Sequence, residues 1–280
     1  MKITNKQNLP EVFVKIAESN NHEYKENRYS ITELILPTRE IILNRLHAKT
    51  IESDVSDMIP AMFGTAIHKI FEEAEPENAE VKLELNLGEY TIVGVIDKLT
   101  DDAIEDYKTC SVSKIMRKDF DDWKSQGFSY AWMWFMLHSE IKRKFRVRAL
   151  MKDWSKIKAA SISDYPQSPI ATIDFDIQDS DYDYIESWIK NKLKEIEYGF
   201  KFLPRCTDEE RWYTGTKYAV YKKVGDARAA YVADSEDDAH NYITNKCGGA
   251  AEIQVRRGEY LKCKYYCSCS KYCEKGESDG

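Results

Sequence analysis

Two aspartates and one lysine stand close together in the sequence, in a pattern that suits phosphoryl chemistry. Asp97 ends one alternating segment, Asp106 lies near the end of the next, and Lys108 follows two residues later. If these segments are antiparallel neighbours, the two carboxylates lie within about two residues of register and share one edge of the sheet. Oxygen ligands of this kind suit Mg²⁺ or Mn²⁺ together with substrate phosphates. An ammonium on the same strand face can orient an attacking water or neutralise phosphoryl charge.

Two flanking segments of helical periodicity carry further polar groups. Gly64 stands one turn before His68, and a helical glycine costs about 1 kcal/mol relative to alanine, so a close approach is expected there. Gln126 and Tyr130 are four residues apart and share one helical face. An amide and a phenol on one face can bind a phosphate or a base edge. Taken singly, His68 is better explained as a surface or half-buried histidine, and Gln126 and Tyr130 as an ordinary polar stripe.

A second constellation consists of cysteines. Four of them, Cys263, Cys267, Cys269 and Cys273, crowd into eleven residues, whereas the first 109 residues contain none. Four thiolates can close a structural zinc site or hold an iron–sulfur cluster. The segment between Cys206 and this group can return the chain to its starting point, so we expect Cys206, Cys263, Cys267 and Cys273 to be the ligands, with Cys269 as a spare thiol. Unpaired thiols are the alternative.

Hydrophobic periodicity predicts the elements that position these groups. A helix is expected over residues 61–74, a three-stranded antiparallel meander over 81–108, and a helix over 117–140. Further elements are expected as strands 145–151 and 170–176, helix 181–199, strands 217–223, 228–233 and 251–257, and helix 235–243. The order predicts an α/β fold with a mixed central sheet flanked by helices. We expect a core over residues 1–200 with N-terminal helices, and an α/β insert with a cysteine-cluster tail over 201–280, packed on that core.

Composition limits the class of protein. The 280 residues carry 41 basic and 48 acidic side chains, a net charge of −7, with 42% apolar residues. A real hydrophobic core is therefore expected, and a protein that simply coats nucleic acid is disfavoured. The longest apolar run has seven residues, which is too short to span a bilayer, and no apolar stretch follows the N-terminus. These features predict a cytoplasmic protein without membrane contact.

Positive charge is nevertheless concentrated in one stretch, residues 140–158. Its basic residues are Lys142, Arg143, Lys144, Arg146, Arg148, Lys152, Lys156 and Lys158. This strip is a candidate for phosphate contacts, although charged runs are usually solvated surface. Trp132, Trp134 and Trp154 could stack on single-stranded bases, but the first two lie in the apolar run and are better explained as core residues.

The order of the first motifs resembles the RecB-like branch of the PD-(D/E)XK nuclease superfamily. Its landmarks appear as Gly64-x3-His68, Gly94-x2-Asp97, Asp106-x-Lys108 and Gln126-x3-Tyr130. The resemblance implies a restriction-endonuclease-like core and metal-dependent hydrolysis of DNA phosphodiester bonds. It further implies that His68, Asp97 and Asp106 hold a divalent ion, that Lys108 assists the attacking water, and that Gln126 and Tyr130 position the substrate. Glu84 is a weaker candidate, as an acid on the preceding strand.

The cysteine pattern is most similar to a group of phage-type RecB-like exonucleases with a C-terminal cysteine cluster. That similarity includes Leu203-Pro204-Arg205-Cys206 and extends over residues 30–273; Leu36 stands where some related families have their first cluster cysteine. The resemblance favours a [4Fe–4S] cluster, with structural Zn²⁺ as the alternative, and a role in phage-type DNA recombination, replication or processing in the host cytoplasm. DNA ends are the implied substrate, and recombination or replication proteins are the implied partners. The alternatives are a non-catalytic DNA-binding or scaffold module on the same fold and a CRISPR-adaptation-type trimming nuclease.

Overall fold

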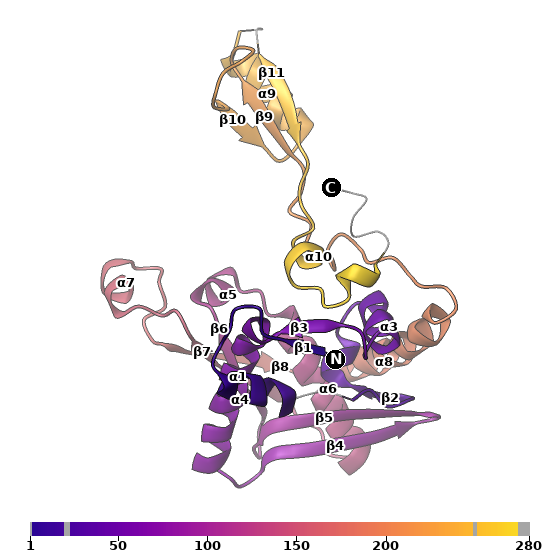
Figure 1. Cartoon of the computed structure of the whole chain (residues 1–280). Coiled ribbons are helices and arrows are strands. Elements are labelled where there is room, and N and C mark those ends of the chain that lie inside the picture. The colour runs from indigo at the N-terminus through magenta and orange to yellow at the C-terminus, as the bar shows by residue number, and fades with distance from the viewer. Residues whose placement is uncertain (1, 20–22, 249–250, 274–280) are drawn as a thin grey trace. The chain divides into compact units, whose positions relative to one another are not determined.

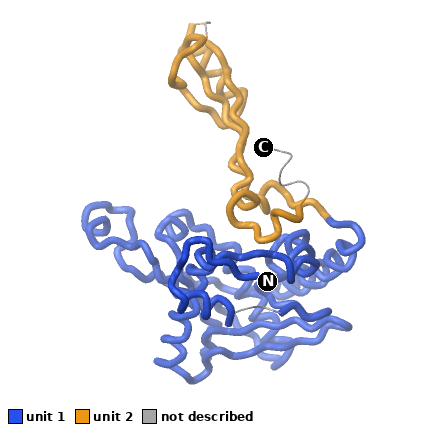
Figure 2. Tube along the Cα trace, viewed as in Figure 1, with its two compact units in different colours: residues 1–203 blue, residues 204–280 orange. Residues whose placement is uncertain are grey.

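The chain divides into two compact units, residues 1–203 and residues 204–280 (Figure 2). The computed structural model describes residues 2–19, 23–248 and 251–273. Each unit has its own sheet and its own cluster of buried apolar side chains.

Unit 1 is built on a six-stranded mixed sheet (Figure 1). The strand order is β2-β5-β6-β7-β8, and β4 also pairs with β5. The strands are β2 (Arg28–Ser30), β4 (Ala79–Leu87), β5 (Tyr90–Leu99), β6 (Ile104–Cys110), β7 (Lys144–Met151) and β8 (Ile170–Asp176). The β2–β5 and β6–β7 pairs are parallel and the other pairs are antiparallel. A separate parallel pair joins β1 (Lys2–Thr4) to β3 (Glu52–Asp54).

Helices connect and flank these strands. They are α1 (Glu11–Ser19), α2 (Ile31–Leu34), α3 (Thr38–Leu46), α4 (Val55–Ala74), α5 (Val112–Arg117), α6 (Asp121–His138), α7 (Lys156–Ser161) and α8 (Asp179–Gly199). Helix α6 approaches the sheet closely at Gly127, where a Cβ atom would lie 2.3 Å from the ring of Phe145. Because the helix comes this near, Trp132 is 1% exposed and belongs to the core, as expected. Helix α8 in turn packs against α6 and α3.

Two predicted helices have different boundaries from those expected. Helix α4 begins at Val55 and not at residue 61, because the Asp54 side chain accepts a hydrogen bond from Ser56 N and caps the helix, with Pro60 inside it. The helix expected over 117–140 is two helices, since Lys118 has φ 54° and ends α5 in the left-handed conformation.

Unit 2 contains a small antiparallel sheet in the order β10-β9-β11, formed by β9 (Lys217–Tyr221), β10 (Tyr231–Ala233) and β11 (Glu252–Arg256). Ser235 caps the N-terminus of helix α9 (Glu236–Lys246), and its hydroxyl accepts a hydrogen bond from Asp238 N. The buried cluster of this unit consists of Val220, Ala233 and Ala239. The short helix α10 (Leu261–Tyr265), which contains Cys263, and the 3₁₀ turn η1 (Ser270–Tyr272), which Cys269 and Cys273 flank, follow.

The predicted architecture, a mixed α/β fold with a central sheet flanked by helices, is confirmed. Across the described parts of the chain, none of the helices combines the length and apolar character that a membrane span requires.

Candidate active site

The end of the β5–β6 ladder places Asp97 beside β6. The last ladder pairs include Lys98↔Glu105, which sets Asp97 opposite Asp106. At this point Tyr107 N donates a hydrogen bond to Asp97 Oδ2 at 2.7 Å. The carboxylate therefore satisfies a backbone donor where the two strands part, and its other oxygen stays available.

Lys108 occupies the same face of β6 as Asp106, as the two-residue period of a strand requires. Its Nζ lies 3.0 Å from Asp106 Oδ1 and 2.8 Å from Oδ2, so a buried carboxylate and a half-buried ammonium form an ion pair. Lys108 Nζ also donates to Gln126 Oε1 at 2.9 Å. The Asp106 carboxylate and the Gln126 amide thus hold the ammonium from two elements, β6 and α6, that are separated in sequence.

Gln126 and Tyr130 form a hydrogen bond with each other across one turn of α6. Gln126 Nε2 donates to Tyr130 Oη at 3.0 Å. Tyr130 is 4% exposed, and burial raises the pKa of its phenol, so it remains protonated. A Cβ atom at Gly94 would lie 2.7 Å from Tyr130 Cε1, so the glycine leaves room for the ring. The structure thus links both residues to Lys108, and their expected role in positioning DNA stays a prediction.

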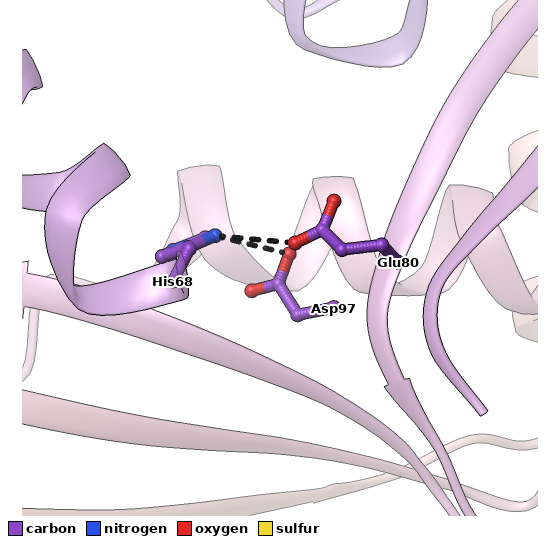
Figure 3. A group of neighbouring side chains, drawn as sticks. All are labelled: His68, Glu80 and Asp97. Carbon is purple, nitrogen blue, oxygen red and sulfur yellow. Dashed lines mark ion pairs between the residues drawn. The ribbon is translucent and has the colours of Figure 1, made fainter. Parts of the chain in front are cut away.

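His68 reaches the same place from α4. Its Nε2 donates to the Tyr107 carbonyl at 2.6 Å, which leaves the Nδ1 lone pair directed at Asp97 Oδ1, 3.5 Å away, and Glu80 Oε1, 3.9 Å away. Figure 3 shows the imidazole and the two carboxylates converging from α4, β4 and β5. One ligand atom from each of the three residues lies within 4.8 Å of the others. A histidine oriented by a backbone carbonyl in this way is typical of metal ligands.

Glu80 is a functional candidate that the sequence reasoning missed. The strand was expected to begin at residue 81, whereas β4 begins at Ala79, and its pairs Ala79↔Lys98 and Val81↔Ile96 place Glu80 beside Asp97. Extending the expected strand by one residue at its start would have found it. The acid that sequence reasoning suggested on this strand, Glu84, forms an ion pair with Arg28 at 2.8 Å instead.

The electrostatics of this cluster favour a bound cation. Burial, and then the neighbouring Asp106 carboxylate, raise the pKa of Asp97 to about 7. Burial also raises the pKa of Asp106, opposed by the adjacent Lys108 ammonium. With neutral imidazole, the carboxylates of Glu80, Asp97 and Asp106 and the Lys108 ammonium sum to a formal charge of −2. A divalent cation would compensate that charge and displace the proton from Asp97.

The side chains line one pocket of about 570 Å³. His68, Glu80, Asp97, Lys108, Gln126 and Tyr130 all contribute to its wall, together with residues from β2, β4 and β5. The pocket therefore joins the acids, the lysine and the imidazole in a single space that a substrate can enter.

Ion pairs within unit 1 engage much of the basic strip over residues 140–158. Arg146 binds Glu105 and Asp174, and Arg148 also binds Glu105. Lys142 is buried and donates to the carbonyl oxygens of Thr100 and Asp101. Several charges expected to contact DNA are therefore used to hold the sheet and its loops together.

The four predicted cysteine ligands belong to one unit and lie near one another. Burial, then Glu210, and then the thiols of Cys273, Cys263 and Cys267 raise the pKa of Cys206 to about 12. Among the described residues no cysteine trio has its sulfur atoms as close as the 4.8 Å of the acidic site. Binding one metal centre therefore requires these thiols to draw together.

Cys269, which was expected to be a spare thiol, is buried with its Sγ 3.5 Å from Cys267 Sγ. Cys269 is therefore as close to Cys267, one of the four candidate ligands, as a fellow ligand would be.

Comparison with known proteins places the chain only at the level of distant structural similarity. No protein-family model and no curated protein matches the sequence. The crystal structure of SSO0001 superposes with a TM-score of 0.45 and 17% identity, over 66% of this chain and 84% of that one. LHK-Exo, an alkaline exonuclease from Laribacter hongkongensis, in complex with dAMP gives a TM-score of 0.40 and 11% identity, over 63% and 91%. With TM-scores below 0.5, the function has to be argued from the site itself.

Proposed function

We propose that the chain is a metal-dependent deoxyribonuclease that hydrolyses phosphodiester bonds in the pocket between α4, β4–β6 and α6. The observation that carries this proposal is the trio His68, Glu80 and Asp97, whose ligand atoms lie within 4.8 Å of one another, beside an ammonium held by two partners. Acidic oxygens, one oriented imidazole and one lysine are the groups that phosphodiester hydrolysis needs for charge and positioning.

The residues present fit a divalent cation, Mg²⁺ or Mn²⁺. The His68 Nδ1 lone pair, Glu80 Oε1 and Asp97 Oδ1 converge, and their surroundings leave negative charge uncompensated. His68, Glu80 and Asp97 would hold the ion, and Asp106 is the further carboxylate that borders them. Such an ion lowers the pKa of water and draws charge from a phosphate.

The chain's own groups then position the reaction. Asp106 and Gln126 fix the position of the Lys108 ammonium. From there it orients the attacking water and neutralises charge on the phosphate oxygens. Tyr130, locked beside Gly94, keeps Gln126 in place and so acts through it. The Tyr107 carbonyl accepts a hydrogen bond from His68 Nε2, so the imidazole is held as the tautomer with its proton on Nε2.

The cysteine group fits a second metal centre, a [4Fe–4S] cluster or a structural Zn²⁺. Cys206, Cys263, Cys267 and Cys273 would be the ligands, because the other three thiols lie near Cys206 and, with burial, raise its pKa, and a bound cation would favour the Cys206 thiolate. Anaerobically purified protein is expected to be brown and to contain iron and sulfide, or else one zinc per chain. Colourless, metal-free protein that is stably folded would exclude both versions.

The finer assignment is exonuclease action on DNA ends in phage-type recombination, replication or processing. The RecB-like order of motifs supports it, and the partners would be proteins of those processes.

Digestion of end-labelled single- and double-stranded DNA with Mg²⁺ or Mn²⁺ tests the activity. Wild-type protein should release label, and Lys108→Ala should lower the rate by about 10²-fold or more. Lys190→Ala is the matched control, because it removes only a surface ion pair with Glu186 on α8. Equal digestion by wild type and Lys108→Ala would overturn the site, and DNA binding without cleavage under either ion would identify a non-catalytic module.

A further inference from the structure

Unit 2 exposes large aromatic side chains next to its cysteines. Trp212 is 49% exposed, Tyr265 is 63% exposed and Tyr266 is 69% exposed. A small unit with few buried apolar residues leaves these rings in solvent, although their burial would be favourable. Contiguous exposed aromatic surface of this kind marks a binding site.

The three rings form one continuous surface. The Trp212 and Tyr266 ring centroids are 5.2 Å apart, and those of Tyr265 and Tyr266 are 6.5 Å apart. Backbone hydrogen bonds from Leu261 N to Trp212 O and from Lys262 N to Arg211 O fasten the two segments that carry the rings. The surface is therefore built by chain segments about fifty residues apart and not by one flexible loop.

Lysines are interleaved with the rings. Lys262 Nζ lies 6.0 Å from the Trp212 centroid, and Lys264 Nζ lies 5.2 Å from that of Tyr265. Lys264 also forms an ion pair with Glu259 at 2.9 Å, but both side chains are exposed, and an exposed pair of this kind contributes little and can yield to a phosphate. The two segments 205–213 and 256–273 together hold seven Lys and Arg against four Asp and Glu, a local excess of positive charge in a chain of net charge −7. We name Trp212, Lys262, Lys264, Tyr265 and Tyr266 the aromatic–basic surface.

We propose that the aromatic–basic surface binds single-stranded nucleic acid, with bases stacked on the rings and phosphates beside the lysines. Aromatic faces with interleaved cations are the chemistry that recognises unpaired bases without sequence preference. A duplex does not present free base faces, so a single strand is the form that fits. The inference deepens the proposed function by naming the form of substrate that unit 2 holds.

Fluorescence anisotropy with a labelled oligothymidine tests the proposal on the full chain, with no divalent ion added so that cleavage does not interfere. Trp212→Ala and Tyr265→Ala should each weaken binding by about tenfold, and Trp212→Phe should restore most of the loss because it keeps a stacking ring. Tyr184→Ala is the matched control, since Tyr184 on α8 is 66% exposed and belongs to unit 1.

Three results would overturn the proposal: unchanged affinity in Trp212→Ala and Tyr265→Ala, an equal loss in Tyr184→Ala, or equal affinity for a duplex of the same length. If Trp212→Ala fails to fold, Tyr265→Ala decides, because that ring is more exposed. Binding is measured apart from cleavage, so a chain that binds but never cuts DNA contradicts the proposed function alone. A chain that cuts DNA but loses no affinity in these variants contradicts this inference alone.

Discussion

The acidic pocket of unit 1 and the cysteine segment of unit 2 both gather metal-binding side chains, but they hold them in different ways. In the acidic pocket, hydrogen bonds from Tyr107 N and to Tyr107 O fix Asp97 and His68, and a large core supports the strands. In the cysteine segment, Cys263 lies on α10, Cys267 and Cys273 lie in the turns around α10 and η1, and Cys206 lies outside any helix or strand, in a unit whose buried cluster has three residues.

This difference in packing predicts which of the two proposed metal sites needs its metal in order to fold. A small apolar cluster supplies little folding free energy, so we expect the metal proposed for the cysteine segment to contribute to the stability of unit 2. The acidic pocket is assembled by packing, and there the proposed metal would supply charge and chemistry. Four predictions test this contrast, in order of expected effect.

Removing a cysteine ligand should have the largest effect. Cys263→Ser is expected to lose the bound metal and to lower the stability of unit 2 by roughly 3 kcal/mol or more, because ligation and folding are coupled. Hydrogen exchange measured by peptide should rise throughout residues 204–273 and stay unchanged in the β5–β6 region. Cys247→Ser, at the end of α9, is the control and should keep the metal. Equal exchange in both variants would mean that unit 2 does not rely on a metal.

Removing the Glu80 carboxylate should weaken the binding of a divalent ion. Glu80→Gln is expected to lower Mn²⁺ affinity about 10- to 100-fold, a loss typical of groups around a metal site, while the fold is unaffected. Isothermal titration with Mn²⁺ measures this directly. Glu84→Gln, on the same strand but paired with Arg28, should bind as wild type does. If Glu84→Gln lost the affinity and Glu80→Gln kept it, the assignment of the trio would be wrong.

Two glycines of the motifs should respond in opposite ways. Gly94→Ala forces a Cβ to 2.7 Å from the buried Tyr130 ring, so we expect a loss of about 1–3 kcal/mol and a displaced Gln126. Gly64→Ala meets only Thr109 Oγ1 at 3.9 Å, so it should stabilise α4 by up to about 1 kcal/mol. Urea unfolding of the metal-free variants gives both values. A destabilised Gly64→Ala would show that close packing, and not open space, surrounds α4 there.

The smallest effect should be a pH dependence from Asp97. Its pKa is about 7 in the folded chain against an ordinary value of 3.8, so the folded state holds a proton that the unfolded state has lost. The stability of the metal-free protein therefore falls as pH rises from about 4 to about 7. Asp97→Asn should lose most of that pH dependence, because it removes the group that titrates.

Denaturant titrations at pH 4.5 and 8 compare the wild type, Asp97→Asn and the exposed control Asp183→Asn. Mn²⁺ affinity should change in the opposite direction and rise with pH, because the ion displaces the same proton. Parallel curves for the wild type and Asp97→Asn would remove Asp97 as the titrating group.

The sequence predicted most of the elements because their hydrophobic periods are local. The alternation in residues 81–108 and the helical spacing in 181–199 correspond to β4–β6 and α8. The boundaries that failed were set by interactions that a period does not record, namely the Asp54 cap of α4 and the left-handed Lys118. Glu80 was missed for the same reason, because the hydrophobic alternation placed the start of its strand at residue 81.

By itself, the sequence determined the residue types, their spacing and the face on which each lies: Asp106 and Lys108 on one side of a strand, Gln126 and Tyr130 on one side of a helix. The tertiary structure alone decided which of these groups meet. It placed Glu80 beside His68, directed Gln126 to Lys108, and bound Arg146 to Glu105 and Asp174. Distances across a sheet depend on register and on how closely helices pack against it, and those follow from the fit of distant side chains in the core.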